Sequence, residues 1–581
     1  MTQRRKPYLV TKSLRNYLFA AILSMAVGNI NLLIDGILMG QFLGPDELAA
    51  INLSLPVINS IHALSLLFSV GGVMIAARAL GKMNRKRLYE VFTISIFAVL
   101  TVGLLILIFS KPLSGFTAHM ITSDKSLASL CEKYVNILML GGIPIMCTDV
   151  LSAYLNVTGH PKVVTVGTCM SVFVNISMDV LLVKVFRMDI GGSALATVLG
   201  NIARLVFFVL FILRKKDLLK FTFRISNPFR DLGEIISKSI AETVAVFAVV
   251  ALQVICSGFV QASLGAQGMF VLSIGYSILG LSLMVSDGMS TTFTAIGGNM
   301  MGQKDYQGLR FLFRRGILIC FLAGLTFFFV GLLFPGPLAT LFGADTEALK
   351  ALSARGIPFI TTFILALTVM TPVSTHLQVL GHFALSTAAN TMQLVSIFVS
   401  CLLVSKLLTP EDIWYAFPLA CALCLLSTFA LCIIGKLFSH TPVNFPSLIP
   451  ADDPESKHFE LSVACTEDAL HEAIEELWMY LDDNRFGELS SRVAHSVEEL
   501  LVNAIQHSDD ATHYIDILIG ADSNELTVLL KDDGTPFDTS ACPSAKKKNG
   551  LKIAHHYCDS ISYSYTFGQN MTLMTWQLEA R

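Results

Sequence analysis

The sequence is poor in charged residues. Asp, Glu, Lys and Arg make up 14% of its 581 positions, whereas hydrophobic residues make up 53%. Soluble globular domains carry about 25% charged residues. The composition therefore excludes a soluble globular protein and predicts a polytopic membrane protein. The formal net charge of -2 identifies no partner, and we expect no nucleic acid to bind.

The cysteines lack the spacing of a disulfide framework. Nine of the twelve are scattered through the apolar segments before Phe438. Cys421 and Cys424 form a CxxC pair, but the apolar run around them favours packing over a metal or redox site. The basic start of the chain leads into a hydrophobic segment that is too long for a signal-peptide core, so we interpret it as the first span.

Runs of about 20 apolar residues, the length that crosses a bilayer, predict twelve membrane spans. They lie near residues 16–40, 52–77, 90–110, 132–157, 163–185, 192–213, 239–262, 270–298, 310–334, 353–378, 384–405 and 412–436. Basic residues crowd the second and sixth loops and follow the eighth span, for example at Arg78, Arg214 and Arg310. Because basic loops stay in the cytoplasm, we expect a multi-pass protein of the plasma (inner) membrane with both termini cytoplasmic.

The two sets of six spans form an internal repeat. Leu43-Gly44 and Gly81 recur 221 residues later as Leu264-Gly265 and Gly302. An even number of spans in each half makes the two repeats parallel, and transporters of this kind place their cavity between the halves.

Three polar residues stand inside apolar runs of the first half. Asn175 and Asp179 lie four apart in VFVNISMDVLLV and share one helical face, while Asp35 lies in INLLIDGILMG. A carboxylate at that depth costs roughly 2.5 to 3.5 kcal/mol unless it faces a polar interior. We interpret these residues as the core of a cation site; the alternative is a carboxyl that is protonated or hydrogen-bonded between helices. The repeat places Cys256 and Cys401 at the positions equivalent to the two acids.

The stretch LIDGILMGQFLGPDELAAINLSLPVINSIHALSLLFSVGGVMIAARALG, with the basic loop after it, resembles the opening of the multidrug and toxic compound extrusion (MATE) transporters. The resemblance covers roughly residues 12–437. It implies a coupling-cation site at positions that match the family's motifs: Asp35, Asn175, Asp179 and Thr197. It also implies export of organic, often cationic compounds, driven by inward H+ or Na+.

One position departs from the family pattern, and two further acids match it less closely. Ala20-Ala21 stands where family members commonly have a proline early in the first span. Glu242 and Asp287, in the seventh and eighth spans, are candidates for lining a cavity of the second half. Glu242 could equally be a residue of a cytoplasmic helix end.

After Phe438 the chain becomes polar. We expect residues 1–220 and 221–437 to form the two six-helix halves, 438–457 a linker, and 458–581 a compact cytoplasmic α/β domain. The fold class is thus an all-α membrane bundle with a C-terminal α/β sandwich. The patterns predict strands at residues 459–465, 514–520, 525–532, 560–567 and 571–578. They predict helices at residues 467–483, 488–507 and 550–558.

Three pieces of this domain indicate a nucleotide site. Glu499 and Asn503 share a helical face, so the Asn oxygen can hold Mg2+ while the Glu orients a water. KDDGTPFD follows a strand and offers an acid to an adenine amino group. KKKNGLKIAHH puts lysines and a glycine at a helix start, which suits an anion. The alternative reading is an amphipathic helix, a turn and a basic lid.

In this order the pieces resemble the GHKL ATPase and kinase superfamily, most closely the serine kinases of the anti-sigma-factor type. The matching residues are Glu499, Asn503, His507, Asp532, Gly534, Gly550 and Thr572, the last within GQNMTL. The resemblance implies that Asn503 holds Mg2+, Glu499 acts as the base and Asp532 reads adenine. Lys548 replaces the first glycine of the lid motif, so ATP binding is better supported than catalysis. For His555, His556 and Cys558, packing on a helix is favoured over a metal site.

The leading hypothesis is a cation-coupled exporter of small organic compounds with a cytoplasmic ATP-binding regulatory domain. A second makes the C-terminal domain a serine kinase of a regulatory partner protein, anchored in membrane lipids. A third is a lipid-type flippase, against which the retained Asp35, Asn175 and Asp179 argue. The sequence has no GxxxxGK[ST] loop, so we do not expect ATP to drive transport directly.

Overall fold

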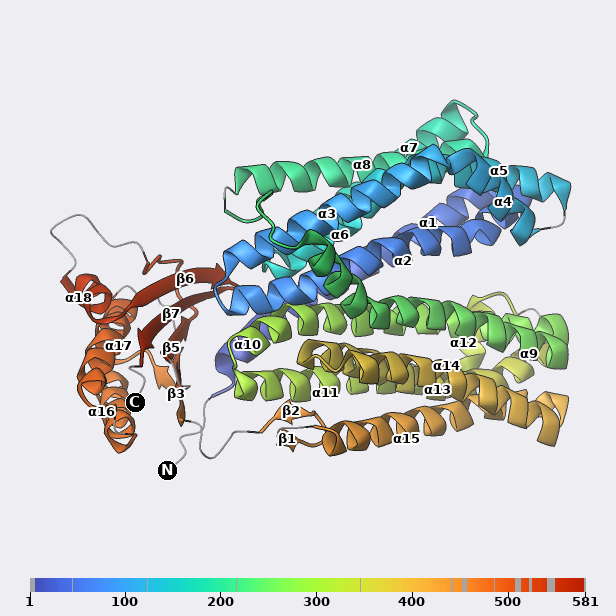
Figure 1. The fold of residues 1–581 in the computed structure, drawn as a ribbon. Helices are drawn as coiled ribbons and strands as arrows, with labels where there is room; N and C mark the ends of the chain where they lie inside the picture. The colour runs from blue at the N-terminus through green and yellow to red at the C-terminus, as the bar shows by residue number, and fades with distance from the viewer. Residues whose placement is uncertain are drawn as a thin grey trace.

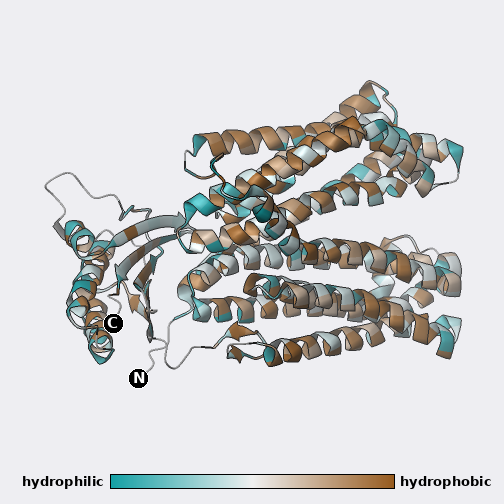
Figure 2. Cartoon of the chain, viewed as in Figure 1, coloured by the Kyte–Doolittle hydropathy of each residue, from teal (hydrophilic) through white to brown (hydrophobic). Residues whose placement is uncertain are grey.

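The structure is a computed structural model in which a long helical bundle carries a helix-and-sheet domain at one end (Figure 1). It describes residues 6–578 except 44, 123, 216, 345, 440–441, 452–456, 485, 507–513, 522–524 and 541–548. Hydrophobic residues dominate the bundle, whereas the small domain is mixed (Figure 2). The bundle and the α/β domain confirm the predicted fold class.

Within its described residues, the first half of the bundle contains eight α-helices. They are α1 (Tyr8–Phe42), α2 (Pro45–Gly81), α3 (Arg85–Ile108), α4 (Ser110–Ile121), α5 (Lys125–Leu140), α6 (Gly142–Val157), α7 (Pro161–Asp179) and α8 (Ile190–Arg214). A π-helix, η1 (Val180–Val185), follows α7 directly. Side chains cap three of these helices: Asn84 caps α3, Asp124 caps α5 and Asp189 caps α8.

The second half repeats this plan with one very long helix. Its elements are α9 (Pro228–Thr292), the π-helix η2 (Phe293–Gly297), α10 (Gly298–Gly302), α11 (Tyr306–Leu333), α12 (Pro335–Leu341), α13 (Glu347–Leu380), α14 (Phe383–Leu407), the 3-10 helix η3 (Pro410–Tyr415) and α15 (Ala416–Leu437). The predicted loop between the seventh and eighth spans is only a kink in α9 at Gly265, where φ is +59°.

Among the described residues, ten helices are long and apolar enough to cross a membrane. The bent pair α5 and α6 makes an eleventh span. Counting α9 as two spans on either side of Gly265 accounts for the twelve predicted from the sequence.

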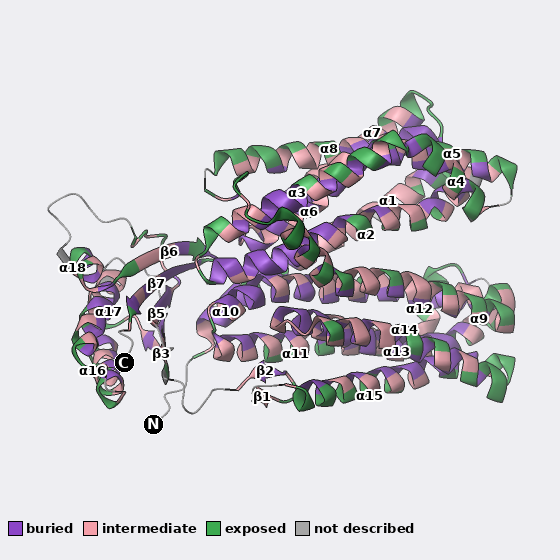
Figure 3. Ribbon diagram, viewed as in Figure 1, coloured by how far each residue is buried: buried purple, intermediate pink, exposed green. Residues whose placement is uncertain are grey.

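The two halves pack together at the end next to the small domain. One core cluster contains buried side chains from both halves, such as Leu14 and Phe293. Farther along the bundle each half has its own cluster, around Tyr134 in the first and Trp414 in the second. Buried residues are accordingly dense where α2 meets α10 (Figure 3). The bundle is closed at this end.

The predicted linker packs on the bundle. It forms two short strands, β1 (Val443–Asn444) and β2 (Ile449–Pro450). Ile449 is buried, and the Ser447 carbonyl oxygen lies 3.0 Å from Nε2 of His376 in α13. The described part of the linker is therefore held against the second half.

The C-terminal domain is a five-stranded antiparallel sheet with helices on one face. Its elements are β3 (Lys457–Ala464), α16 (Glu467–Asp483), α17 (Glu488–Gln506), β4 (Tyr514–Ala521), β5 (Glu525–Asp532), α18 (Asn549–Tyr557), β6 (Ser560–Thr566) and β7 (Gln569–Gln577). The strand order is β3-β4-β5-β7-β6. Phe567 and Gly568 form the β6–β7 turn with positive φ angles, as a two-residue type I′ hairpin requires. The opposite face of the sheet meets the bundle (Figure 1).

Candidate functional sites

The polar residues of the first half come together in its interior. Asp179 is the last residue of α7, directly before the π-helix η1, and is fully buried. Asn175 lies one turn earlier and is 3% exposed. Asp35 of α1 is close enough to Asp179 for direct electrostatic interaction. A π-helix at such a place is frequent at functional sites because it redirects the side chains of one helical turn.

This cluster contains buried oxygens that accept no hydrogen bond from a donor group in the described part of the chain, although the carboxyl groups of Asp35 and Asp179 lie close enough to share a proton with each other. These oxygens are Asp35 Oδ1, Asn175 Oδ1 and both carboxylate oxygens of Asp179. A buried acceptor without a partner costs about 1–3 kcal/mol. Oxygen atoms of this kind are the ligands that protons and hard cations prefer. The residues present therefore fit a small cation.

A close helix contact positions the fourth predicted residue, Thr197. The Asn175 amide donates to Thr197 Oγ1 over 3.4 Å. This contact between α7 and α8 depends on Gly200, because a Cβ there would lie 2.8 Å from the Ser171 carbonyl oxygen and 3.2 Å from the Asn175 Cβ. Tyr134 of α5, which the sequence patterns did not single out, is buried within electrostatic range of both Asp35 and Asp179.

The second half keeps the geometry of this site but not its acids. Cys256 and Cys401, the equivalents of Asp35 and Asp179, are buried and interact through their side chains. The other two acids of this half also lie close together. Glu242 accepts a hydrogen bond from Gln378 over 3.1 Å and interacts electrostatically with Asp287.

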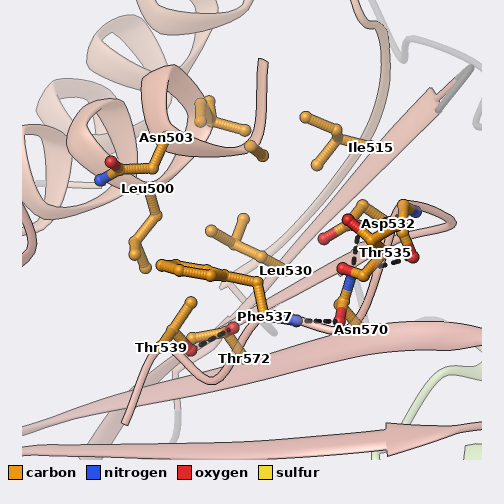
Figure 4. A pocket seen from close by; sticks show the side chains of 13 residues that line it. Leu500, Asn503, Ile515, Leu530, Asp532, Thr535, Phe537, Thr539, Asn570 and Thr572 are labelled. Atoms are coloured by element: carbon orange, nitrogen blue, oxygen red, sulfur yellow. Dashed lines mark hydrogen bonds between the residues drawn. The ribbon is translucent and has the colours of Figure 1, made fainter. Parts of the chain in front are cut away.

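A second site lies in the C-terminal domain, between α17 and the sheet. Its cavity is lined by Leu500, Leu501, Asn503, Ala504, Ile515, Leu530, Asp532, Gly534, Thr535, Phe537, Thr539, Asn570 and Thr572. Asn503 lies on the helix side, across the pocket from Asp532 and Asn570 (Figure 4). Phe537 and the aliphatic residues give the pocket an apolar wall, which suits a planar base. Asn503, Asp532, Gly534 and Thr572 are thus brought together as predicted.

Asn570 organises the polar side of this pocket. Its Nδ2 donates to Asp532 Oδ1 (2.7 Å) and to the carbonyl oxygen of Thr535 (3.0 Å), and its Oδ1 accepts from the Phe537 backbone N–H (3.2 Å). Gly534 N also donates to Asp532 Oδ1. Burial raises the pKa of the Asp532 carboxyl, and the hydrogen bonds from Asn570 and Gly534 partly oppose this rise. Both hydrogen bonds fix Oδ1 of the Asp532 carboxyl group at the polar side of the pocket.

The other predicted nucleotide residues are less central. Glu499 is half-buried on α17 and does not line the pocket; its backbone carbonyl oxygen accepts from Asn503 Nδ2 over 2.7 Å. Gly550 lies in the first turn of α18. His507 and Lys548 lie outside the described residues.

The histidines and the cysteine of α18 have structural surroundings. His555 Nε2 lies 3.0 Å from the Thr539 carbonyl oxygen, His556 packs beside Tyr557, and Cys558 belongs to the domain core. The described residues contain no group of three or more potential metal ligands.

Sequence families match both parts of the chain. Residues 20–181 and 243–403 match the MatE family, one segment in each half of the bundle. Residues 464–576 match the histidine kinase-like ATPase domain.

Two relatives illustrate how far the sequence similarity extends. The multidrug export protein MepA of Staphylococcus aureus (strain NCTC 8325 / PS 47) is 27% identical over 214 residues, or 36% of this chain and 48% of the relative. MepA of Staphylococcus haemolyticus (strain JCSC1435) is 28% identical over 220 residues, or 37% and 49%. The chain therefore spans about half the length of these relatives.

Solved structures share the fold of the bundle. The outward-facing conformation of a multidrug resistance MATE family transporter of the MOP superfamily matches with a TM-score of 0.67 and 19% identity, over 75% of this chain and 98% of that one. A MOP superfamily transporter from Pyrococcus furiosus, described as having a binding pocket of reverse polarity, matches with a TM-score of 0.67 and 20% identity, over 76% and 100%. At such identities the likeness establishes the fold alone.

Proposed function

Because this chain belongs to the MatE family and carries a histidine kinase-like ATPase domain, we propose that it is a cation-coupled antiporter that exports small organic compounds and is regulated by ATP. The observation that carries the proposal is the group of unpartnered buried oxygens around Asp35, Asn175 and Asp179. Thr197 completes the set through its contact with Asn175.

The coupling follows from elementary linkage. H+ or Na+ binds these oxygens more tightly in one access state, and the substrate binds more tightly in the other. The cation and the substrate therefore exchange across the membrane. Glu242 and Asp287, which lie within electrostatic range of each other in the second half, are proposed to line the path of a cationic substrate. The lipid bilayer surrounds the apolar bundle.

The proposed orientation has both termini in the cytoplasm of a cell with an inner membrane. Its support is the position of the basic residues. Arg78, Arg87 and Arg310 lie near the end of the bundle that carries the C-terminal domain, and basic residues stay on the cytoplasmic side.

In the C-terminal domain, ATP would fit the pocket with adenine against the Asp532 carboxyl group and the apolar wall. Asn503 is the residue that would hold Mg2+ when it accompanies ATP. The lid glycine Gly550 stands at the start of α18, where backbone N–H groups favour an anion. Since Glu499 does not line the pocket, we propose nucleotide binding in preference to serine kinase activity toward a regulatory protein.

Efflux from vesicles under separate proton and sodium gradients tests the first part of the proposal. Asp179→Asn and Asp35→Asn should each abolish gradient-driven efflux without loss of membrane insertion, whereas Asp412→Asn, in η3 of the other half, should leave it unchanged. Full transport by both variants would contradict the coupling mechanism.

ATP binding and phosphate transfer test the second part. The chain should bind ATP, and Asn503→Ala should weaken the Mg2+-dependent component of binding. Phosphate transfer to a partner protein, lost in Asn503→Ala, would instead favour the kinase. Efflux that requires the C-terminal domain at every ATP concentration would argue against a purely regulatory role.

A further inference from the structure

The two faces of the C-terminal sheet have different neighbours. Side chains alternate along a strand, so neighbouring residues point to opposite faces. On β5, Leu530 belongs to the core beneath the helices and Asp532 lines the nucleotide pocket, whereas Leu529 belongs to a separate cluster with Met83 of the bundle. One face therefore holds the pocket and the other contacts the bundle.

The contacts with the first half are numerous. Gln569 at the start of β7 donates to the Leu9 carbonyl oxygen (3.0 Å) and to Ser13 Oγ (2.9 Å), both in α1. Phe567 at the hairpin tip packs edge-on against Tyr17, with ring centroids 5.8 Å apart. These contacts anchor the domain to α1.

The contacts with the second half include a buried ion pair. Lys531 Nζ on β5 pairs with Asp305 Oδ2 over 2.6 Å, and the two side chains are 3% and 0% exposed. Asp305 begins α11, where its Oδ1 accepts from the Gly308 backbone N–H. Gln303, in the same turn, contacts the sulfur of Met571 on β7. The sheet thus spans the junction of the two halves at their closed end.

Residues of the pocket are direct neighbours of the residues that bridge the halves. Asp532 stands between Lys531, which binds the second half, and Asp533, which pairs with Lys12 of α1 over 2.6 Å. Asn570 likewise stands between Gln569 and Met571 on β7. A ligand that shifts the backbone at Asp532 or Asn570 therefore shifts segments that contact both halves.

Transporters of this architecture change access by rocking one half against the other. Opening this end requires Asp305 and α1 to separate, which the rigid sheet resists. We propose that the C-terminal domain is a clamp across the two halves, and that nucleotide in its pocket sets how firmly the clamp holds this end closed. This inference rests on the ATP binding proposed above. The quantity that ATP would regulate is the closure of this end of the bundle.

The test measures the distance between the halves in the full chain. Spin labels replace Lys86 and Arg314, exposed residues of α3 and α11, in a background with Cys169, Cys465 and Cys542 changed to serine. Saturating ATP with Mg2+, or a non-hydrolysable ATP analogue, should change the ratio of closed to open populations at least about fivefold, the lower end of allosteric couplings. By reciprocity, the affinity of the nucleotide for the closed state and its affinity for the open state should differ by the same factor.

Variants of the bridging ion pair locate the coupling. Lys531→Met should abolish the nucleotide response of the distance while leaving nucleotide bound, because Lys531 faces away from the pocket. If this variant fails to fold, Lys531→Met combined with Asp305→Asn neutralises both partners and retains an oxygen that caps α11. Lys12→Met should weaken the response, and Arg15→Met, an exposed cation on the same helix, is its matched control.

Nucleotide that binds without any change in the distance overturns the clamp and leaves ATP binding intact. A response that persists in both Lys531 variants also overturns it. Failure of nucleotide to bind at all overturns the proposed ATP site itself.

Discussion

Gly81 and Gly302 lie back to back where the two halves of the bundle meet. A Cβ on Gly81 would lie 2.9 Å from the Gly302 Cα, and a Cβ on Gly302 would lie 3.0 Å from the Gly81 Cα. The internal repeat makes these two positions equivalent. Their contact indicates that the pseudo-twofold axis of the bundle passes between them. Only glycine permits two helix ends to approach this closely.

Gly302→Ala should open the closed end of the bundle. The new methyl group would meet the Arg78 carbonyl oxygen at 2.2 Å, and backbone cannot yield as a flexible side chain does. We expect a cost to the closed state of about 1–3 kcal/mol, the usual range for overpacking. The measurement is the distance between labels in the two halves. Gly280→Ala, which has open space around it, is the control; equal distances in the two variants would contradict the prediction.

Gly200→Ala should weaken the binding of the coupling cation without removing any of the proposed cation ligands. The methyl group would push α8 away from Ser171 and Asn175, so the hydrogen bond between Asn175 and Thr197 would be lost. A loss of about 1.4 kcal/mol would raise the cation concentration for half-maximal efflux about tenfold. Gly28→Ala, with nothing near it, should leave that concentration unchanged. An unaltered concentration in Gly200→Ala would remove Thr197 from the proposed site.

Asn570→Ala should weaken ATP binding and destabilise the C-terminal domain. The substitution leaves the Phe537 backbone N–H without its acceptor and releases the turn after β5. An unpaired buried group costs about 1–3 kcal/mol. Calorimetric unfolding and nucleotide titration measure the two effects. Gln577→Ala, at the exposed end of the same strand, serves as the control and should change neither.

ATP affinity should fall with decreasing pH in the mildly acidic range. In the proposed ATP site the carboxylate form of Asp532 would accept the hydrogen bond from adenine, and burial raises the pKa of this carboxyl above its ordinary value. Affinity is therefore retained above the raised pKa and lost below it, at a higher pH than an ordinary aspartate with a pKa of about 3.9 would give. Asn570→Ala should shift this loss to still higher pH, since the hydrogen bond from Asn570 opposes the rise.

The control for this pH effect is Asp532→Asn. It should bind ATP more weakly at neutral pH and show no loss on acidification. Wild-type affinity that stays constant down to about pH 4 would contradict the role of Asp532.

Local sequence patterns predicted most secondary structure of this protein. The expected helix over residues 467–483 coincides with α16, and the expected strand over 525–532 coincides with β5. Such elements follow from the spacing of apolar side chains within one segment, which needs no knowledge of the rest of the chain. The same spacing predicted a loop between the seventh and eighth spans. The structure has one continuous helix there, α9, with a kink at Gly265.

The candidate sites were predictable where a motif lies within one element. Asn175 and Asp179 are one turn apart on α7, so their shared face follows from helical geometry. The nearby Tyr134 could not be found in this way, because it comes from α5 and its own segment is an ordinary amphipathic helix. The sequence predicts that Glu499 and Asn503 share a helical face. Only the packing of α17 decides that Asn503 lines the pocket and Glu499 does not.

The sequence by itself determined a duplicated membrane bundle, the presence of Asp35 and Asp179 in its first half only, and the resemblance of the C-terminal domain to a nucleotide-binding superfamily. The first two follow from composition, periodicity and the repeat, and the third follows from the order of short motifs. Only the tertiary structure decided that the C-terminal sheet lies across both halves. The contact that reveals it joins Lys531 to Asp305 across 226 positions. Each of these residues alone is an ordinary charge in a polar stretch, and only the fold brings the two together and excludes water from them.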